Sequence, residues 1–267
     1  MRQYIKYALN KLKPSRVIKD IYGISYYDSR LDALTRHIAI NKVYEEYKEI
    51  EEFIFTYKLS FDTAIDVGAN CGLVTLPLSK KFKKVISFEP DPSNFQSLNK
   101  NISLNSAKNI LCHQLAVADS PGVIQLSVNR IIDGDGMINS GLSSLHKKNR
   151  VFSKDIVNTD VITIDDYCFQ NGIDDLSFLK IDTEGYEHLT LLGALETIKS
   201  SLPAIFYEFS LTLDNRCGDD SRKKSFNFLH QLGYSHYYLV ENVFKELNHR
   251  EVDSIQKDIN LFAIHSA

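Results

Sequence analysis

Short apolar runs alternate along the chain with segments in which apolar residues recur at helical spacing. Each run has the length of a buried strand, and a helix-like segment or a turn separates it from the next. Buried strands joined by helices are typical of a parallel sheet with crossover connections. The pattern therefore predicts an α/β domain over residues 61–267. Its strands are expected at residues 63–67, 84–88, 110–117, 123–128, 176–181, 204–209, 236–240 and 260–264, and its helices at residues 91–105, 186–199 and 222–232.

The first 60 residues show a different pattern. From residue 31 to residue 58, apolar positions recur at helical spacing among charged ones, which predicts one or two helices ahead of the sheet. We expect residues 1–60 to form an N-terminal helical extension or cap. The mildly amphipathic start lacks the features of a secretory signal, and no stretch has the length and apolar character of a membrane span. Four basic residues there can either touch a membrane surface or form a solvated helical face: Arg2, Lys6, Lys11 and Lys13.

Residues 129–151 form the longest irregular stretch, and they are rich in Gly, Asp, Asn and Ser. A loop of this length inside a compact domain is more often functional or mobile than idle. We expect it to lie on the substrate side of the domain.

Composition narrows the choice of partners. The formal net charge is -3 and the pI is about 6.2, so the basic excess that nucleic-acid binding requires is missing, and no nucleic acid is expected. The four cysteines lie far apart and form no Cys-x-x-Cys pair. This usage predicts reduced thiols in a cytoplasmic protein.

A glycine-rich turn stands where the first strand of the predicted sheet meets a helix. Residues 66–72 read Asp-Val-Gly-Ala-Asn-Cys-Gly, and glycines at such a turn let the backbone approach a ligand closely. The Gly-x-x-x-Gly spacing differs from the dinucleotide and triphosphate patterns, which favours a ligand without phosphates. Pro77 falls inside the helix expected after the turn and should kink it.

Glu89 ends the second strand run. A carboxylate at this position can accept hydrogen bonds from both hydroxyls of an adenosine ribose. The alternative is structural, with Gly72 permitting close packing of helix on strand and Glu89 capping the following turn.

Three ordered segments carry a more specific signal: residues 66–72, residues 88–90 (Phe-Glu-Pro) and residues 179–187 (Leu-Lys-Ile-Asp-Thr-Glu-Gly-Tyr-Glu). Together they resemble the FkbM family of methyltransferases, and the resemblance covers roughly residues 63–210. It implies a Rossmann-like class I methyltransferase fold that binds S-adenosylmethionine. Such a fold has a seven-stranded, mostly parallel sheet with an antiparallel last strand and helices on both faces.

The resemblance also implies roles at the methionine end of the methyl donor. Gly68, Asn70 and Gly72 would surround the methionine moiety, and Asp66 would lie near its amino group.

At the adenosine end, the resemblance implies that Glu89, beside Pro90, holds the ribose. The stretch 112–117, which includes His113 and Ala116, would flank the adenine. A lone histidine such as His113 is also an ordinary strand-end residue.

A second group of acids follows the strand at residues 176–181. Asp182 and Glu184 should face the same crevice, where a carboxylate can orient the sulfonium or accept the proton of a substrate hydroxyl. Asp182 is the first choice for that role. Glu187 is expected to be a favourable acid in the first turn of the next helix. A divalent metal held by these three acids is a further alternative, but no histidine cluster supports it and no metal is expected.

Two further residues are candidates for the proton acceptor. Glu208 ends the fifth strand and resembles a glutamate that the family often has here, but Ser210 stands where a histidine is common. His146, in the long loop, has a near-neutral reference pKa, with a solvent-exposed loop histidine as the alternative.

The family resemblance implies O-methylation of a hydroxyl, often on a sugar in a polysaccharide, glycolipid or glycosylated metabolite. Two other classes stay open: an NAD(P)-dependent oxidoreductase on a similar sheet, and a non-catalytic module that retains the adenosyl pocket. The missing third glycine of the dinucleotide fingerprint argues against the oxidoreductase.

Overall fold

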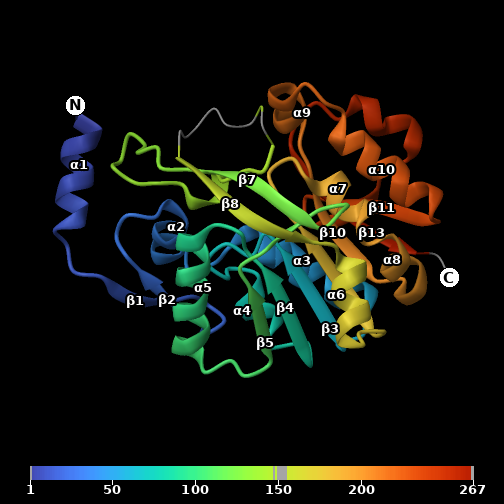
Figure 1. Cartoon of the computed structure of the whole chain (residues 1–267), viewed down its shortest axis with the longest axis horizontal. Coiled ribbons are helices and arrows are strands. Elements are labelled where there is room, and N and C mark those ends of the chain that lie inside the picture. Colours follow the sequence, from blue (N-terminus) through green and yellow to red (C-terminus); the bar gives the residue numbers. More distant parts are fainter. Residues whose placement is uncertain (1, 147, 149–154, 266–267) are drawn as a thin grey trace.

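The computed structural model describes residues 2–146, 148 and 155–265 (Figure 1). Its main sheet has the strand order β12-β11-β13-β10-β9-β3-β4-β5. The strands are β3 (Thr63–Val67), β4 (Lys84–Phe88), β5 (Ile110–His113), β9 (Leu176–Ile181), β10 (Ala204–Phe209), β11 (Tyr234–Val240), β12 (Val243–Glu246) and β13 (Ile259–His265).

The pairing of the strands confirms the predicted fold class. β5, β4, β3, β9 and β10 run parallel, and β13 lies antiparallel between β10 and β11. The strand count differs from the expected seven, because β12 adds an eighth strand in an antiparallel hairpin with β11. Both residues between these strands, Glu241 and Asn242, have positive φ, as a tight hairpin turn requires.

Helices cover both faces of the sheet, and alternate strand residues face opposite layers. In β3, Ile65 and Val67 pack on one face and Ala64 on the other. The first face carries α6 (Ile164–Asn171), α7 (Glu187–Leu192), α8 (Leu195–Ser201) and α10 (Ser221–Gln231). The second carries α2 (Ala33–Asn41), α3 (Glu45–Tyr57), α4 (Thr75–Leu78) and α5 (Pro92–Asn105), and α9 (Leu211–Cys217) and the 3-10 turn η3 (His249–Ser254) complete the domain.

A small second sheet stands over the carboxyl ends of the main strands, with the order β6-β8-β7. It consists of β6 (Ala116–Val117), β7 (Gly122–Val128) and β8 (Asp155–Ile162). The predicted strand 110–117 is therefore wrong as one element, because it divides between β5 and β6. β8 was not predicted at all.

The first 60 residues are not wholly helical, which corrects the expectation for this segment. After α1 (Arg2–Lys11), the strands β1 (Arg16–Lys19) and β2 (Ser25–Asp28) form an antiparallel hairpin. Side chains of α5 hold it, since Asn101 accepts a hydrogen bond from the Tyr27 N–H and Asn105 accepts one from the Ser25 N–H. α2 and α3 share a hydrophobic core with the sheet, while the division at residue 60 stays a prediction.

Two predicted helices are shorter than expected. The helix after the glycine-rich turn is the single turn α4, which contains Pro77. The segment 186–199 breaks into α7 and α8 at Gly193, where the carboxylate of Asp165 accepts hydrogen bonds from the N–H groups of Glu196 and Thr197 and so begins a new helix. In the part of the chain that the structure describes, no helix combines the length and apolarity needed to cross a bilayer.

Candidate functional site

A cleft opens at the carboxyl ends of β3, β4 and β9, and we call it the donor cleft. Its floor is the glycine-rich turn, with Gly68 and Asn70, and Glu89 closes one side. The loop from residue 139 to residue 145 lies across it, and Tyr44 and Glu46 enter from the N-terminal segment. Open α/β sheets bind ligands at this edge because parallel strands end there together.

The glycine-rich turn is tightly packed and internally bonded. Gly68 has a φ of +81°, and a Cβ added to it would lie 1.8 Å from the Asp182 carbonyl oxygen. The N–H groups of Gly68 and Ala69 both donate to the Phe88 carbonyl, and those of Asn70, Cys71 and Gly72 donate to Glu89, Asn70 and Ala69. The backbone N–H groups of residues 68–72 are therefore all used within the protein.

Glu89 is buried and connects two turns. Its carboxylate accepts hydrogen bonds from the Asn70 N–H at 2.7 Å and the Asp91 N–H at 2.8 Å. Burial raises the pKa of Glu89 to about 8, although these two hydrogen bonds favour the charged form. Each carboxylate oxygen can still accept a second hydrogen bond, so the bonds to the turn leave capacity for a ligand hydroxyl.

Lys180 links the floor of the donor cleft to the acids beyond it. Its side chain is 3% exposed, and its ammonium nitrogen lies 3.4 Å from both Asp66 Oδ1 and Asp182 Oδ2 and 3.8 Å from Glu46 Oε1. It also donates to the Gly68 carbonyl at 3.1 Å. Burial disfavours the ammonium, but the three carboxylates outweigh that effect and raise the pKa of Lys180.

Glu46 brings a carboxylate from α3 into the donor cleft. The Tyr44 hydroxyl donates to its Oε2 at 3.0 Å. Burial raises the pKa of Glu46 to about 7, against the opposing effect of Lys180. This group therefore changes charge in the neutral pH range.

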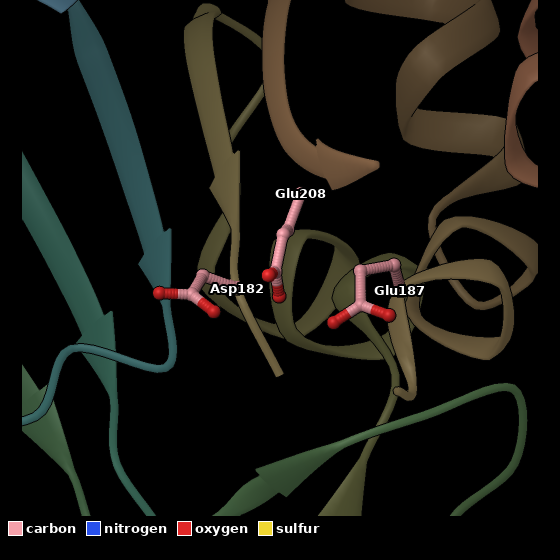
Figure 2. Close-up of side chains that lie close together, drawn as sticks. All are labelled: Asp182, Glu187 and Glu208. Atoms are coloured by element: carbon pink, nitrogen blue, oxygen red, sulfur yellow. The ribbon is translucent and has the colours of Figure 1, made fainter. Parts of the chain in front are cut away.

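Four carboxyl groups gather where β9 and β10 end, and we call Asp182, Glu184, Glu187 and Glu208 the acid cluster. Figure 2 shows three of their side chains close together, and carboxylate oxygens of Asp182, Glu187 and Glu208 all lie within 4.8 Å of one another. Such a group could hold a metal ion. Glu208 Oε2 is buried and has no hydrogen-bond partner among the described residues.

Repulsion within the acid cluster adds to the cost of burial. Burial and then the charge of Asp182 raise the pKa of both Glu184 and Glu208 well above the ordinary range. Burial likewise raises the pKa of Glu187, although its Oε1 accepts bonds from the Thr183 N–H, the Thr183 hydroxyl and the Gly185 N–H. The acid cluster thus favours a proton or a nearby positive charge.

A family model for the methyltransferase FkbM domain matches residues 66–238, which is more than half of the chain and includes both the donor cleft and the acid cluster. The chain belongs to the FkbM methyltransferase family. The resemblance stated from the three sequence segments is thereby confirmed.

Individual relatives match over part of their length. A protein named Methyltransferase 1 from Beauveria bassiana is 26% identical over 145 residues, which cover 48% of this chain and 57% of that protein. A tRNA (guanine(37)-N(1))-methyltransferase from Anopheles gambiae is 24% identical over 127 residues, covering 43% of this chain and 23% of that protein. The match thus spans less than two thirds of either relative.

Among solved structures, the methyltransferase FkbM from Methylobacillus flagellatus aligns with a TM-score of 0.47 at 20% identity. The alignment covers 77% of this chain and 44% of that one.

In this FkbM family chain, five of the eight residues predicted to contact the cofactor line the donor cleft: Gly68, Asn70, Glu89, Pro90 and Ala116. The other three do not line it. Asp66 is fully buried and accepts a hydrogen bond from the Thr75 hydroxyl at 2.6 Å. A Cβ on Gly72 would meet Leu98 at 2.8 Å, so this glycine permits close packing instead.

His113 is the third of these exceptions. Its Nε2 lies 2.8 Å from the Tyr167 hydroxyl, and its ring stacks on Phe88. Burial lowers the pKa of His113. The ring is thus directed into the interior beside α6, and only the later residues of this segment reach the donor cleft.

The predicted proton acceptors lie in different places. Asp182 and Glu184 line the donor cleft, whereas Glu208 lines a neighbouring hollow at the ends of β10 and β13. His146 lines neither. Its ring packs edge-on against Tyr186, and burial lowers its pKa.

We call residues 129–146 the roof loop. Its part from residue 139 to residue 145, which contains the 3-10 turn η1 (Ser140–Leu142), lies across the donor cleft. The Ser143 hydroxyl donates to Asp91, the Asn94 amide donates to the Ser140 carbonyl, and the Ser144 hydroxyl donates to the Glu184 carbonyl. The rest of the predicted loop, Lys147 and residues 149–151, lies outside the described residues.

Sequence reasoning missed Tyr44, Glu46 and Lys180. For Lys180 a signal was present, because a charged residue inside the apolar run of β9 must find buried partners. Tyr44 and Glu46 carried no such signal, since they belong to an ordinary amphipathic segment.

Proposed function

We propose that the chain is an S-adenosylmethionine-dependent O-methyltransferase. The observation that carries this proposal is the acid cluster at the edge of a cleft built from a glycine-rich turn and Glu89. A cationic methyl donor fits this combination, because the cleft offers hydrogen bonds for an adenosine and the acids favour a positive charge. Bound S-adenosylmethionine would supply a methyl group on a leaving group that is already activated.

The residues of the donor cleft suit the two ends of that donor. Glu89 accepts the ribose hydroxyls, and Pro90 and Ala116 lie against the adenine. Gly68 and Asn70 surround the methionine end, where Asp66 acts indirectly through Lys180. Asp182 and Glu184 face the sulfonium.

The same turn argues against a dinucleotide. Phosphate-binding turns present free backbone N–H groups to the anion, whereas the N–H groups of residues 68–72 already donate to protein acceptors. The buried carboxyl group of Glu89 beside them would also repel a pyrophosphate when ionised. This favours the methyltransferase over the oxidoreductase.

Proton transfer in the proposed reaction uses the acid cluster. As the acceptor oxygen attacks the methyl carbon, the C–O bond forms, the C–S bond breaks, and the hydroxyl proton passes to a carboxylate. Asp182 lines the donor cleft and is the first candidate for that carboxylate, with Glu208 beside it. Alignment of nucleophile and methyl can lower the barrier by roughly 7–11 kcal/mol, and a base adds about 10²–10⁴-fold in rate.

We further propose that the acceptor is a hydroxyl of a carbohydrate, bound from the hollow beside Glu208. Polar side chains line that hollow, including Glu49, Asp258 and Asn260, and they suit a molecule with several hydroxyl groups. Acids near the reacting atoms disfavour a nucleic acid backbone. The four free cysteines support our proposal of a cytoplasmic location.

A divalent cation held by Asp182, Glu187 and Glu208 is a second candidate for activating the acceptor. Glu187 and Asp182 are already engaged, by three hydrogen bonds and by Lys180. We therefore propose that transfer needs no added metal.

The test compares glycans from cells that produce the wild type, Asp182→Asn or the control Glu246→Gln, which alters an exposed carboxyl group on β12. Mass spectrometry should find a methylated sugar with the wild type and the control, and a loss of about 10²-fold or more with Asp182→Asn. Labelled S-adenosylmethionine and the purified acceptor should then react equally with and without a chelator. Identical glycans in all three samples would contradict the carbohydrate proposal, and chelator-sensitive transfer would favour the metal.

A further inference from the structure

α1 is amphipathic with its apolar face turned outward. Four large apolar side chains on it or directly after it are exposed, with fractions of 61% for Tyr4, 56% for Ile5, 56% for Leu9 and 82% for Leu12. Their spacing places them on one side of a helix. Single exposed apolar residues are ordinary, but a contiguous stripe of them indicates a binding surface.

Hydrogen bonds on the opposite, polar side of α1 hold the helix in this orientation. Lys6 donates to the Gly134 carbonyl at 3.0 Å and to Asp135 at 2.9 Å, and the Asn10 amide donates to the carbonyls of Asp135 and Gly136. A Cβ on Gly136 would lie 2.4 Å from a backbone nitrogen of α1. The helix therefore packs its polar side closely on the roof loop. Figure 1 shows α1 at the edge of the molecule.

The segment that carries the apolar stripe is rich in basic residues. Residues 2–19 contain six basic residues and no acid, in a chain whose net charge is -3. Five of the six are exposed: Arg2, Lys11, Lys13, Arg16 and Lys19. In the hairpin that follows, Val17 and Ile21 are also exposed, at 52% and 65%.

We propose that this surface, the α1 face, docks on an anionic phospholipid bilayer. An apolar stripe flanked by lysine and arginine matches the boundary between acyl chains and negatively charged headgroups. A second copy of the chain is a poorer occupant, because a symmetric contact would bring the same basic groups together. The inference stands on residues 2–21 and does not depend on the methyl-transfer proposal.

The test is cosedimentation of the full chain with vesicles of phosphatidylcholine alone or mixed with phosphatidylserine. The wild type should sediment with the mixed vesicles and be released by salt, because screening weakens attraction to the headgroups. Leu9→Ser combined with Leu12→Ser should lower the vesicle affinity about tenfold or more. Phe169→Ser, which removes a side chain that is 90% exposed on α6, is the matched control.

Three outcomes would overturn the proposal. They are absence of sedimentation with either vesicle, equal sedimentation of wild type and double variant, and a dimer in analytical ultracentrifugation that the double variant abolishes. The variants alter exposed side chains only, so circular dichroism should show unchanged folding.

Discussion

The glycine-rich turn and the acid cluster lie side by side in the domain, but they differ in how completely their polar groups are hydrogen-bonded. In the turn, the backbone N–H groups of residues 68–72 and the carboxyl group of Glu89 bond to nearby protein groups. In the acid cluster, like charges gather, and Glu208 Oε2 is buried without a hydrogen-bond partner among the described residues. The turn is therefore a preformed surface, whereas in the acid cluster Glu208 gains stability from a proton or a nearby cation.

Lys180 connects the two regions, because its ammonium group contacts both of them. It donates to the Gly68 carbonyl and lies 3.4 Å from Asp182. Without it, the fully buried Asp66 would have no cation beside it among the described residues.

Replacing Lys180 with Met should produce the largest effect. The change leaves Asp66, Asp182 and Glu46 without their shared cation, and removal of one partner from a buried ion pair costs about 3–5 kcal/mol. Urea unfolding at neutral pH measures the loss of stability. Lys199→Met is the matched control, because Lys199 is half exposed and forms an ion pair with the exposed Glu196. Equal stabilities of the two variants would show that Lys180 does not join the regions.

Replacing Glu208 with Gln should have a smaller effect of the opposite sign on stability. Burial raises the pKa of Glu208 in the folded protein above that in the unfolded chain. Its contribution to stability is therefore full below the unfolded pKa and is lost as pH rises through the folded pKa. The variant removes this loss, and it should be more stable than the wild type by about 1 kcal/mol at mildly alkaline pH.

Thermal unfolding across pH checks this prediction, with the exposed Glu246→Gln as control. The two variants should differ little at acidic pH, where Glu208 is protonated in both states. A Glu208→Gln protein that is less stable than the control at alkaline pH would contradict the idea of an unsatisfied cluster.

The strands of the main sheet were predictable because β3, β4, β9 and β10 are buried on both faces, which produces uninterrupted apolar runs. Their observed bounds equal the predicted ones. β8 was missed because half of its residues are polar, in the sequence Asp-Ile-Val-Asn-Thr-Asp-Val-Ile. The strand pairs antiparallel with β7 in the second sheet. The sequence of β8 by itself does not indicate that β7 is its partner strand.

The candidate site divides in the same way. The segments around Gly68 and Glu89 could be recognised from neighbouring residues, because the turn and its acid are encoded locally. Glu46 reaches the donor cleft only because α3 packs under the sheet, and the meeting of Glu187 with Glu208 depends on β9 and β10 lying side by side. Such contacts arise from tertiary packing, which a single sequence does not display.

The most direct test of a cleft that prefers a cationic donor compares two ligands by calorimetry. S-adenosylmethionine carries the sulfonium charge and S-adenosylhomocysteine does not, so only the former should gain affinity as the acids ionise. From acidic pH to above the pKa of Glu46, which is about 7, we expect the preference for S-adenosylmethionine to rise by roughly three- to tenfold. Glu46→Gln should flatten this rise, because it removes the carboxyl group of the donor cleft that changes charge in this pH range. No binding of either ligand, or a preference that is independent of pH, would contradict the proposed site.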